Sequence, residues 1–452
     1  MRHARMLLGA VCFFAVSDAT FGNDLLDAYQ QALERDAVLR SAAFQKAGAD
    51  EVLPQAWATF VPQVTSNVDA GRERLTYLGT LQPPNAIART ATIAATGNVA
   101  TYSVTLSQTV WSLEGLRHVQ EAGLQVAQAQ AVYSAQEENL ILRVAQAYFG
   151  ILSAADKLAT TQSQRDAFGE LLRQAQVREQ QGLSASIDVS EAQSFYDGTE
   201  QAVIDAENDL EDAKRAMGEI TGRYPESAAP LQEDIPLIGP MPDSADEWAL
   251  AAQHDNLDVQ AADLAVQAAE RNLQAQRAKY WPTLSLQGAL SHTDQPESLG
   301  GNQGLDAVQM QLSWPIYQGT TVRSLVRQSS AAYEQAKAQL DQTQRHAERL
   351  ARLAFRSVAT GVVRVQAARR AVESGRKAVE SSRLGVEFGS RNEFDLLNQQ
   401  NNYYAAIRAY RQSRYDYLTA VLQLEQQAGR LHQTDLAHVD ELLVRGSPGV
   451  AP

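Results

Sequence analysis

The chain has 452 residues, of which 44% are hydrophobic, and a formal net charge of −14. This length allows two or three ordinary domains or one large elongated body. The acidic excess argues against a nucleic-acid partner, because phosphate binding requires clustered lysine and arginine. Solubility alone also explains such a charge.

Residues 1–22 have the pattern of an export signal peptide. Two arginines and a histidine precede an apolar run, residues 6–16, that is too short to cross a bilayer as a helix. We place the cleavage site near Gly22, with Ala19 as the alternative. Cys12 is the only cysteine and lies inside this segment, so we expect the mature protein to contain neither disulfides nor cysteine metal sites. Beyond the signal, no apolar run reaches the length of a membrane-spanning helix.

The remaining sequence repeats itself once. We divide it into repeat 1 (23–224), a proline-rich connector (225–243), repeat 2 (244–431) and a C-terminal segment (432–452). Several residues recur in the same order at a constant offset, which indicates an internal duplication. The recurring residues are Gly182, Asp188, Tyr196, Gly222 and Arg223 in the first copy and Gly389, Asp395, Tyr403, Gly429 and Arg430 in the second.

Each repeat is expected to begin with a helix and to end with a long helical hairpin, at 112–221 and 318–429. These stretches lack proline and are rich in strong helix formers. The first helix of each hairpin would run for about 70 residues, or roughly 105 Å. A globular core has no use for helices of that length.

Short breakers mark the two hairpin tips. They contain Gly182 and Gly389, which suit the left-handed backbone at a helix end. Ser186 and Asn392 are the expected N-caps of the returning helices.

Between the first helix and the hairpin of each repeat, the sequence predicts two strands, at 60–111 and 280–317. Apolar and polar residues alternate over about ten positions, as in a strand that crosses a membrane. Val308, Met310 and Leu312 are examples. A soluble hairpin packed on a core would give the same alternation. The export signal, the aromatic residues near the strand ends and the lack of a covering sheet favour lipid-facing strands.

Counting the strands predicts an oligomer. One chain supplies four strands, and β-structure in a membrane cannot leave its edges open. Two chains would close eight strands around a filled interior, whereas three would close twelve around an open lumen. We therefore predict an α+β membrane protein that forms a trimeric 12-stranded β-barrel, with four strands per chain. The segments Arg72–Gly97 and His292–Gly304 are expected to be loops that face outside.

The order of these features resembles the TolC family of outer-membrane efflux and secretion channels, over about residues 24–443. Leu312–Gly319, Ile220–Gly222 and the paired glycine tips carry the resemblance. It implies a homotrimer that contacts outer-membrane lipid in a Gram-negative bacterium and whose β-barrel is continuous with a long periplasmic α-helical barrel. A periplasmic adaptor and an inner-membrane transporter would open this exit duct for type I protein secretion, multidrug efflux or both. No cofactor and no catalysis are implied.

The resemblance also implies functional residues at the tips. Two aspartates three positions apart ring the periplasmic constriction in the family; here they match Asp395 and Asn398, so one carboxylate is lost. Three copies of Asp395 would favour cations near the axis. Alternatively, Asp395 only stabilises the start of its helix.

A second family feature is a polar lock between the hairpins. Arg391 matches its arginine, and Asp188 and Ser186 match its partners, whereas Val386 replaces a family tyrosine. A guanidinium–carboxylate bond suits a latch that a partner can break. A solvated charge at the tip is the alternative for Arg391.

The implied adaptor contacts are the tips themselves, which a helix end would also require to contain glycine. They comprise Gly182, Leu183, Gly389 and Ser390.

A secreted structural stalk or adhesin is the main alternative to a channel, since it would share the export signal and the long helices. Enzymes are disfavoured, because no phosphate loop or nucleophile elbow is found and the histidines lack metal-binding spacing. Beyond the signal these histidines are His118, His254, His292, His346, His432 and His438. The sequence does not specify the exported substrate.

Overall fold

The computed structural model describes residues 24–81, 89–182 and 185–444. The expected export signal and Leu183 therefore lie outside the described residues. The chain forms two compact units. The first contains Met1–Arg40, Glu137–Trp248 and Leu350–Pro452, and the second contains Ser41–Gln136 and Ala249–Arg349. Both repeats contribute segments to both units.

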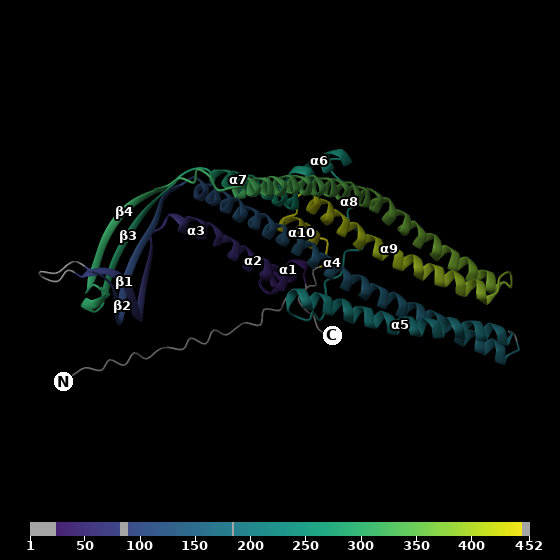
Figure 1. Ribbon diagram of the computed structural model, residues 1–452. Coiled ribbons are helices and arrows are strands. Elements are labelled where there is room, and N and C mark those ends of the chain that lie inside the picture. Colours follow the sequence, from purple (N-terminus) through teal and green to yellow (C-terminus); the bar gives the residue numbers. More distant parts are fainter. Residues whose placement is uncertain (1–23, 82–88, 183–184, 445–452) are drawn as a thin grey trace, which may run out of the picture. The chain divides into compact units, whose positions relative to one another are not determined.

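The second unit contains one four-stranded antiparallel sheet in the order β1-β2-β3-β4 (Figure 1). Its strands are β1 (Gln63–Leu81), β2 (Arg89–Ser112), β3 (Thr283–Asp294) and β4 (Gln303–Ser313). Each predicted strand pair is therefore present, and β2 and β3 join the two repeats in one sheet. The outer sides of β1 and β4 have no strand partner among the described residues.

The expectation that Arg72–Gly97 is a loop was wrong. The ladder between β1 and β2 continues without interruption from Gln63–Ser107 to Leu81–Arg89. The charged and glycine residues of this stretch resemble a loop, but pairing across the hairpin satisfies their backbone N–H and C=O groups. In the second hairpin β3 extends to Asp294, so the connection is likewise shorter than expected. It contains the short 3₁₀-helix η2 (Glu297–Leu299).

Alternation gives the sheet one apolar and one polar face. A row across all four strands pairs Val64 with Leu106, Leu106 with Gly288, and Gly288 with Val308. Val64 and Val308 are 67% and 80% exposed, so none of the described residues covers these two positions of the row. The next row joins polar residues on the opposite face. It consists of Gln63, Ser107, Gln287 and Gln309.

Helices precede each strand pair. The first set is α2 (Ala37–Asp50), α3 (Val52–Trp57) and η1 (Ala58–Phe60), and the second is α6 (Ala245–Asp255) and α7 (Leu257–Ala278).

Side-chain hydrogen bonds attach α7 to the beginnings of both long helices. Asn272 donates to Glu121 at 3.0 Å and accepts from Ser329 at 3.2 Å. Glu121 belongs to α4 and Ser329 to α8. One asparagine on α7 therefore connects the two repeats within the second unit.

Two long helical hairpins continue from the sheet. They are α4 (Leu113–Gln180) with α5 (Ser186–Thr221), and α8 (Thr321–Glu387) with α9 (Glu393–Gln427). At the usual helical rise, α4 and α8 each extend about 100 Å. Both run through the two units, and both hairpins end in the first unit.

Within the first unit, α4 and α9 form a polar contact between the hairpins. Arg411 and the Tyr415 hydroxyl donate to Asp156, each at 2.8 Å. Farther toward the tips, Arg408 donates to Gln164 at 2.7 Å. Figure 1 shows α9 between α8 and the α4/α5 hairpin. Along this stretch the contact is made by the inner helix of each hairpin, α4 and α9, with α8 and α5 on the outer sides. Near the tips α5 also contacts α9.

The connector is held against α9. The Tyr417 hydroxyl donates to the Ile238 carbonyl at 2.8 Å and accepts from its amide at 2.9 Å. The buried Arg414 donates to the Glu233 carbonyl at 3.1 Å. These bonds satisfy the backbone of an extended segment that lacks its own secondary structure.

The ends of the described chain pack together in the first unit. Asp440, at the end of α10 (Gln433–Asp440), accepts a hydrogen bond from the amide of Leu26 in α1 (Leu25–Arg35) at 3.3 Å. Asp36, just after α1, forms two 2.9 Å bonds with the Arg143 guanidinium. Burial alone would raise the pKa of Asp36, but its bonds with Arg143 and the Leu39 amide hold the pKa below the usual value.

Candidate functional site at the hairpin tips

The tips form where each long helix stops at a glycine with a left-handed backbone. Gly182 has φ +70° and Gly389 has φ +71°, a conformation that costs other residues free energy. After Gly389, the amides of Ser390 and Arg391 both bond the Gly385 carbonyl, at 2.8 and 3.0 Å. The glycines predicted for the tips thus have a structural role in ending the helices.

The two returning helices are capped differently. Asn392 accepts a 2.8 Å hydrogen bond from the Asp395 amide, as expected for an N-cap. Ser186 is not a cap, because α5 already begins at this residue. Asp188 supplies the side-chain bond instead: its carboxylate accepts a hydrogen bond from the amide of Ala185, the N-cap residue, at 3.2 Å. A carboxylate in the first turn also interacts favourably with the helix dipole.

Asp395 and Asn398 lie on α9, three residues apart and therefore close to one helix face. Asp395 is half-buried. The Asn398 side-chain amide donates to the Phe394 carbonyl at 3.1 Å. Asp395 is thus the only carboxylate of this pair of positions, as the sequence predicts.

Arg391 interacts with its own hairpin. Its guanidinium donates to the Ser382 hydroxyl at 2.6 Å. Its aliphatic part covers Gly385, where an added Cβ would lie 3.0 Å from the Arg391 Cγ. The predicted partners Ser186 and Asp188 belong to the other hairpin.

An ion pair that the sequence did not reveal joins the tips. Arg178 in the last turn of α4 contacts Glu393, the first residue of α9. The Glu393 side chain is only 15% exposed. The pair could not be predicted because the two residues are far apart in the sequence and belong to different repeats.

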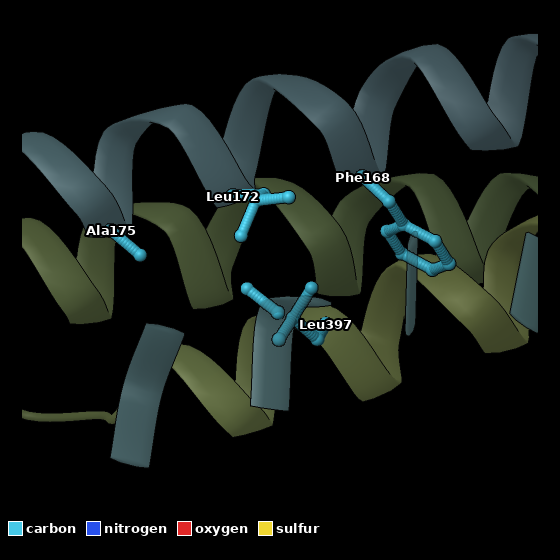
Figure 2. Packing of buried hydrophobic residues seen from close by; sticks show 5 residues of the cluster. Phe168, Leu172, Ala175 and Leu397 are labelled. Atoms are coloured by element: carbon cyan, nitrogen blue, oxygen red, sulfur yellow. The ribbon is translucent and has the colours of Figure 1, made fainter. Parts of the chain in front are cut away.

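A small apolar cluster lies beside this ion pair. Phe168, Leu172 and Ala175 of α4 are buried against Leu397 of α9 (Figure 2). The ring of Phe195, on α5, lies 5.4 Å from that of Phe168 and 6.2 Å from the partly exposed Phe394 ring of α9. Edge-on aromatic contacts of this kind contribute about 0.5–1.5 kcal/mol each beyond the area that they bury.

The surroundings of Glu393 disfavour its negative charge. Burial raises the pKa of Glu393 above its usual value; the positive charge of Arg178 lowers it, and the negative charge of Asp188 raises it again. Because the net shift is upward, the charged form of Glu393 is disfavoured at this place. Apolar contacts therefore hold the two tips together, whereas the burial of the Glu393 charge opposes the contact and Arg178 only partly offsets that cost.

The described residues include no cluster of three or more side chains of the types that hold metal ions. No helix among them combines the length and the apolar character needed to cross a bilayer.

A strand sheet with an uncovered apolar face, joined to long helical hairpins, is the architecture of outer-membrane exit channels. The family described as outer membrane efflux protein matches residues 28–223 and 248–430. The chain belongs to this family.

Similar proteins extend over nearly the whole chain. The outer membrane protein TolC of Vibrio cholerae is 28% identical over 430 residues, which cover 94% of this chain and 95% of the relative. TolC of Escherichia coli is also 28% identical, over 94% of this chain and 86% of its own length. The alkaline protease secretion protein AprF of Pseudomonas aeruginosa is 25% identical, over 97% and 91%.

Solved structures agree on the fold. CusC, a channel-forming protein, matches with a TM-score of 0.76 at 16% identity, over 90% of this chain and 92% of its own. The outer membrane protein VceC of Vibrio cholerae matches with a TM-score of 0.75 at 18% identity, over 90% and 96%. Sequence and fold together establish an exit channel of the Gram-negative outer membrane, rather than a secreted stalk.

The balance of forces at the tips gives a first prediction. We expect Arg178→Gln to destabilise the contact between the hairpins by about 1–3 kcal/mol, because a buried carboxylate loses its counter-ion. We expect Glu393→Gln to change it by less than about 1 kcal/mol, because the neutral side chain no longer opposes burial. Amide hydrogen exchange of residues 168–178 and 393–400 measures both effects.

The same contact should depend on pH. The raised pKa of Glu393 means that the contact is most stable when this group is protonated, below its usual pKa of about 4.5. This contribution is lost as the pH rises through the higher folded-state value. Glu393→Gln should abolish the change; an unaltered pH dependence in this variant would contradict the assignment.

Proposed function

We propose that three copies of the chain assemble into one exit duct. The observation that carries this proposal is the sheet, because the outer sides of its edge strands β1 and β4 have no strand partner among the residues that the structure describes. In a membrane, unpaired backbone groups cost several kcal/mol each, so the edges must pair with other copies. Three copies supply twelve strands, which enclose an open lumen, whereas eight strands enclose a filled one.

We further propose that a periplasmic adaptor and an inner-membrane transporter recruit the duct at its tips. The adaptor would contact Gly182, Leu183, Gly389 and Ser390, where the glycines permit close backbone approach. AprF and PrtF are protease secretion proteins, and BepC and TtgC are efflux proteins. The exported substrate of this chain is accordingly a protein, small toxic molecules or both.

At the closed end, Asp395 and Asn398 form the proposed constriction. Three Asp395 carboxylates near one axis would attract cations. With asparagine at the second position, the ring has half the carboxylates that two aspartates would supply.

Arg391, Asp188 and Ser186 form the proposed lock. Arg391 would exchange its bond with Ser382 for a contact with the first hairpin of its own or a neighbouring copy, and binding of the adaptor would break that contact. A charge-assisted bond has the strength and reversibility that such a latch needs.

Deletion of the gene tests the overall function. We expect the mutant to lose secreted proteins from the medium, to become sensitive to drugs and detergents, or both, with wild-type protein restoring each property. In the parent strain, the protein should be found in outer-membrane fractions as a heat-sensitive oligomer. Unchanged secretion and unchanged susceptibility would contradict the exit-duct assignment for this organism.

For the lock, we expect Arg391→Ala and Asp188→Ala each to raise single-channel conductance in planar bilayers several-fold, because the closed state loses a charge-assisted bond. Arg173→Ala is a matched control, since Arg173 is an exposed tip arginine that pairs within its own helix with Glu170. Unchanged conductance in both lock variants would remove these residues from the gate.

For the constriction, we expect Asp395→Asn to reduce cation selectivity and Asn398→Asp to increase it, because the charge at the narrowest point changes in opposite directions. Reversal potentials under a potassium chloride gradient measure this selectivity. If Asp395 serves only to stabilise the start of α9, Asp395→Asn will lower helix stability and leave the reversal potential unchanged.

A further inference from the structure

The outer helices of the two hairpins carry opposite charges. Helix α5 contains ten acidic and two basic residues, whereas the part of α8 in the first unit, residues 350–387, contains eight basic and three acidic residues. The inner helices are nearly balanced: α9 has four acidic and three basic residues. The charge imbalance is therefore confined to the two helices that lie on the outer sides of the hairpins.

One flank of α5 concentrates this charge. Asp197, Glu200, Ile204 and Glu207 follow each other at intervals of three and four residues, so they form one stripe along the helix. All four are exposed, Ile204 at 56%. The three carboxylates form no ion pair within the described part of the chain. Phe195, which reaches α9, projects from another side of the helix.

A complementary stripe runs along α8. The buried residues of this helix recur at heptad spacing, for example Ala351, Val358 and Val365. Directly opposite, at intervals of seven residues, lie the four exposed side chains of the stripe. They are Val363, Arg370, Lys377 and Leu384. Neither Arg370 nor Lys377 has an ion-pair partner among residues that the structure describes.

The two stripes match in position as well as in charge. Helix α5 leaves its tip at Ser186 and α8 reaches its tip at Glu387, so the two run in opposite directions relative to the tips. Counted from these ends, Lys377 is level with Asp197 to within one residue. Arg370 likewise lies between Glu200 and Glu207. The offsets are at most four residues, or about 6 Å along the axis, within reach of a long basic side chain.

We infer that the α5 stripe binds the α8 stripe of a second copy of this chain, an inference that rests on the proposed trimer. Each copy would offer its acidic stripe to one neighbour and its basic stripe to the other. Such a head-to-tail contact closes a ring when the rotation fits. The exposed Ile204, Val363 and Leu384 would supply apolar contacts among the charges, as in ordinary interfaces. Opposite charges would also fix the vertical register of adjacent copies.

Charge reversal tests this inference in the full-length protein. We expect Glu200→Lys with Glu207→Lys to lower the trimer-to-monomer ratio in detergent extracts of outer membranes by about tenfold, because attraction becomes repulsion at three identical contacts. Arg370→Glu with Lys377→Glu should do the same. Combining all four substitutions should restore most of the trimer, which general damage to the helices would not allow.

A neutral exchange serves as the matched control. Asp212→Arg with Arg215→Asp makes two charge-reversing changes on the same helix and keeps its net charge, and this pair already interacts within the chain. We expect its trimer to resemble that of the wild type. Loss of trimer in this control as well, together with no rescue in the fourfold variant, would overturn the inference.

Disulfide cross-linking gives an independent readout. Ile204 and Arg370 lie at matching levels, and the described residues contain no cysteine. We expect Ile204→Cys with Arg370→Cys to form covalent dimers and trimers on oxidation, whereas either single variant should form no covalent trimers. Suppose that the wild type is a trimer, the charge-reversed variants remain trimers and the double-cysteine variant does not cross-link. This result would overturn the proposed interface but not the trimer. Absence of any wild-type trimer would overturn the proposed assembly.

Discussion

The unpaired edges of the four-stranded sheet are the constraint from which the rest of the assembly follows. Along the outer sides of β1 and β4, backbone N–H and C=O groups have no partner strand in the described chain. Hydrocarbon cannot replace the missing hydrogen bonds, so a single copy has no stable place in a membrane. Because β2 ends at Ser112 and α4 begins at Leu113, the strands and the long helices form one continuous element. Any partner that completes the sheet therefore also brings further helical hairpins into the assembly.

Forces at the other end of the hairpins are smaller and nearly balanced. Apolar contacts such as that between Leu172 and Leu397 favour association of the tips, while the burial of Glu393 near Asp188 opposes it. A contact built in this way can open without a large input of free energy. A fully apolar tip would be more stable but harder to open, and a fully charged one would not stay closed.

The sequence was most informative where periodicity extends over many residues. The ends of α4 and α8 fall within about two residues of the expected positions, because proline-free helical patterns end at glycine tips. Strand length was underestimated at Arg72–Gly97, since charged and small residues on a solvent-exposed hairpin resemble a loop and only backbone pairing identifies them as strand. At the tips, too, local features were predictable and contacts between distant segments were not. The cap at Asn392 was predicted from local sequence, whereas the Arg178–Glu393 pair depends on the packing of separate repeats.

The duplication has a consequence for symmetry. Helices α5 and α9 occupy the same place in their repeats, yet α5 has ten acidic residues and α9 has four. If the two halves were identical, a ring of six equal hairpins would have a single kind of contact, and every substitution would alter all six positions together. Once both halves are joined in one gene, the contact inside a chain and the contact between chains can evolve separately. In the proposed trimer, fusion thus lowers the symmetry of the ring from six-fold to three-fold, and it lets one set of contacts be firm while the other is made to yield.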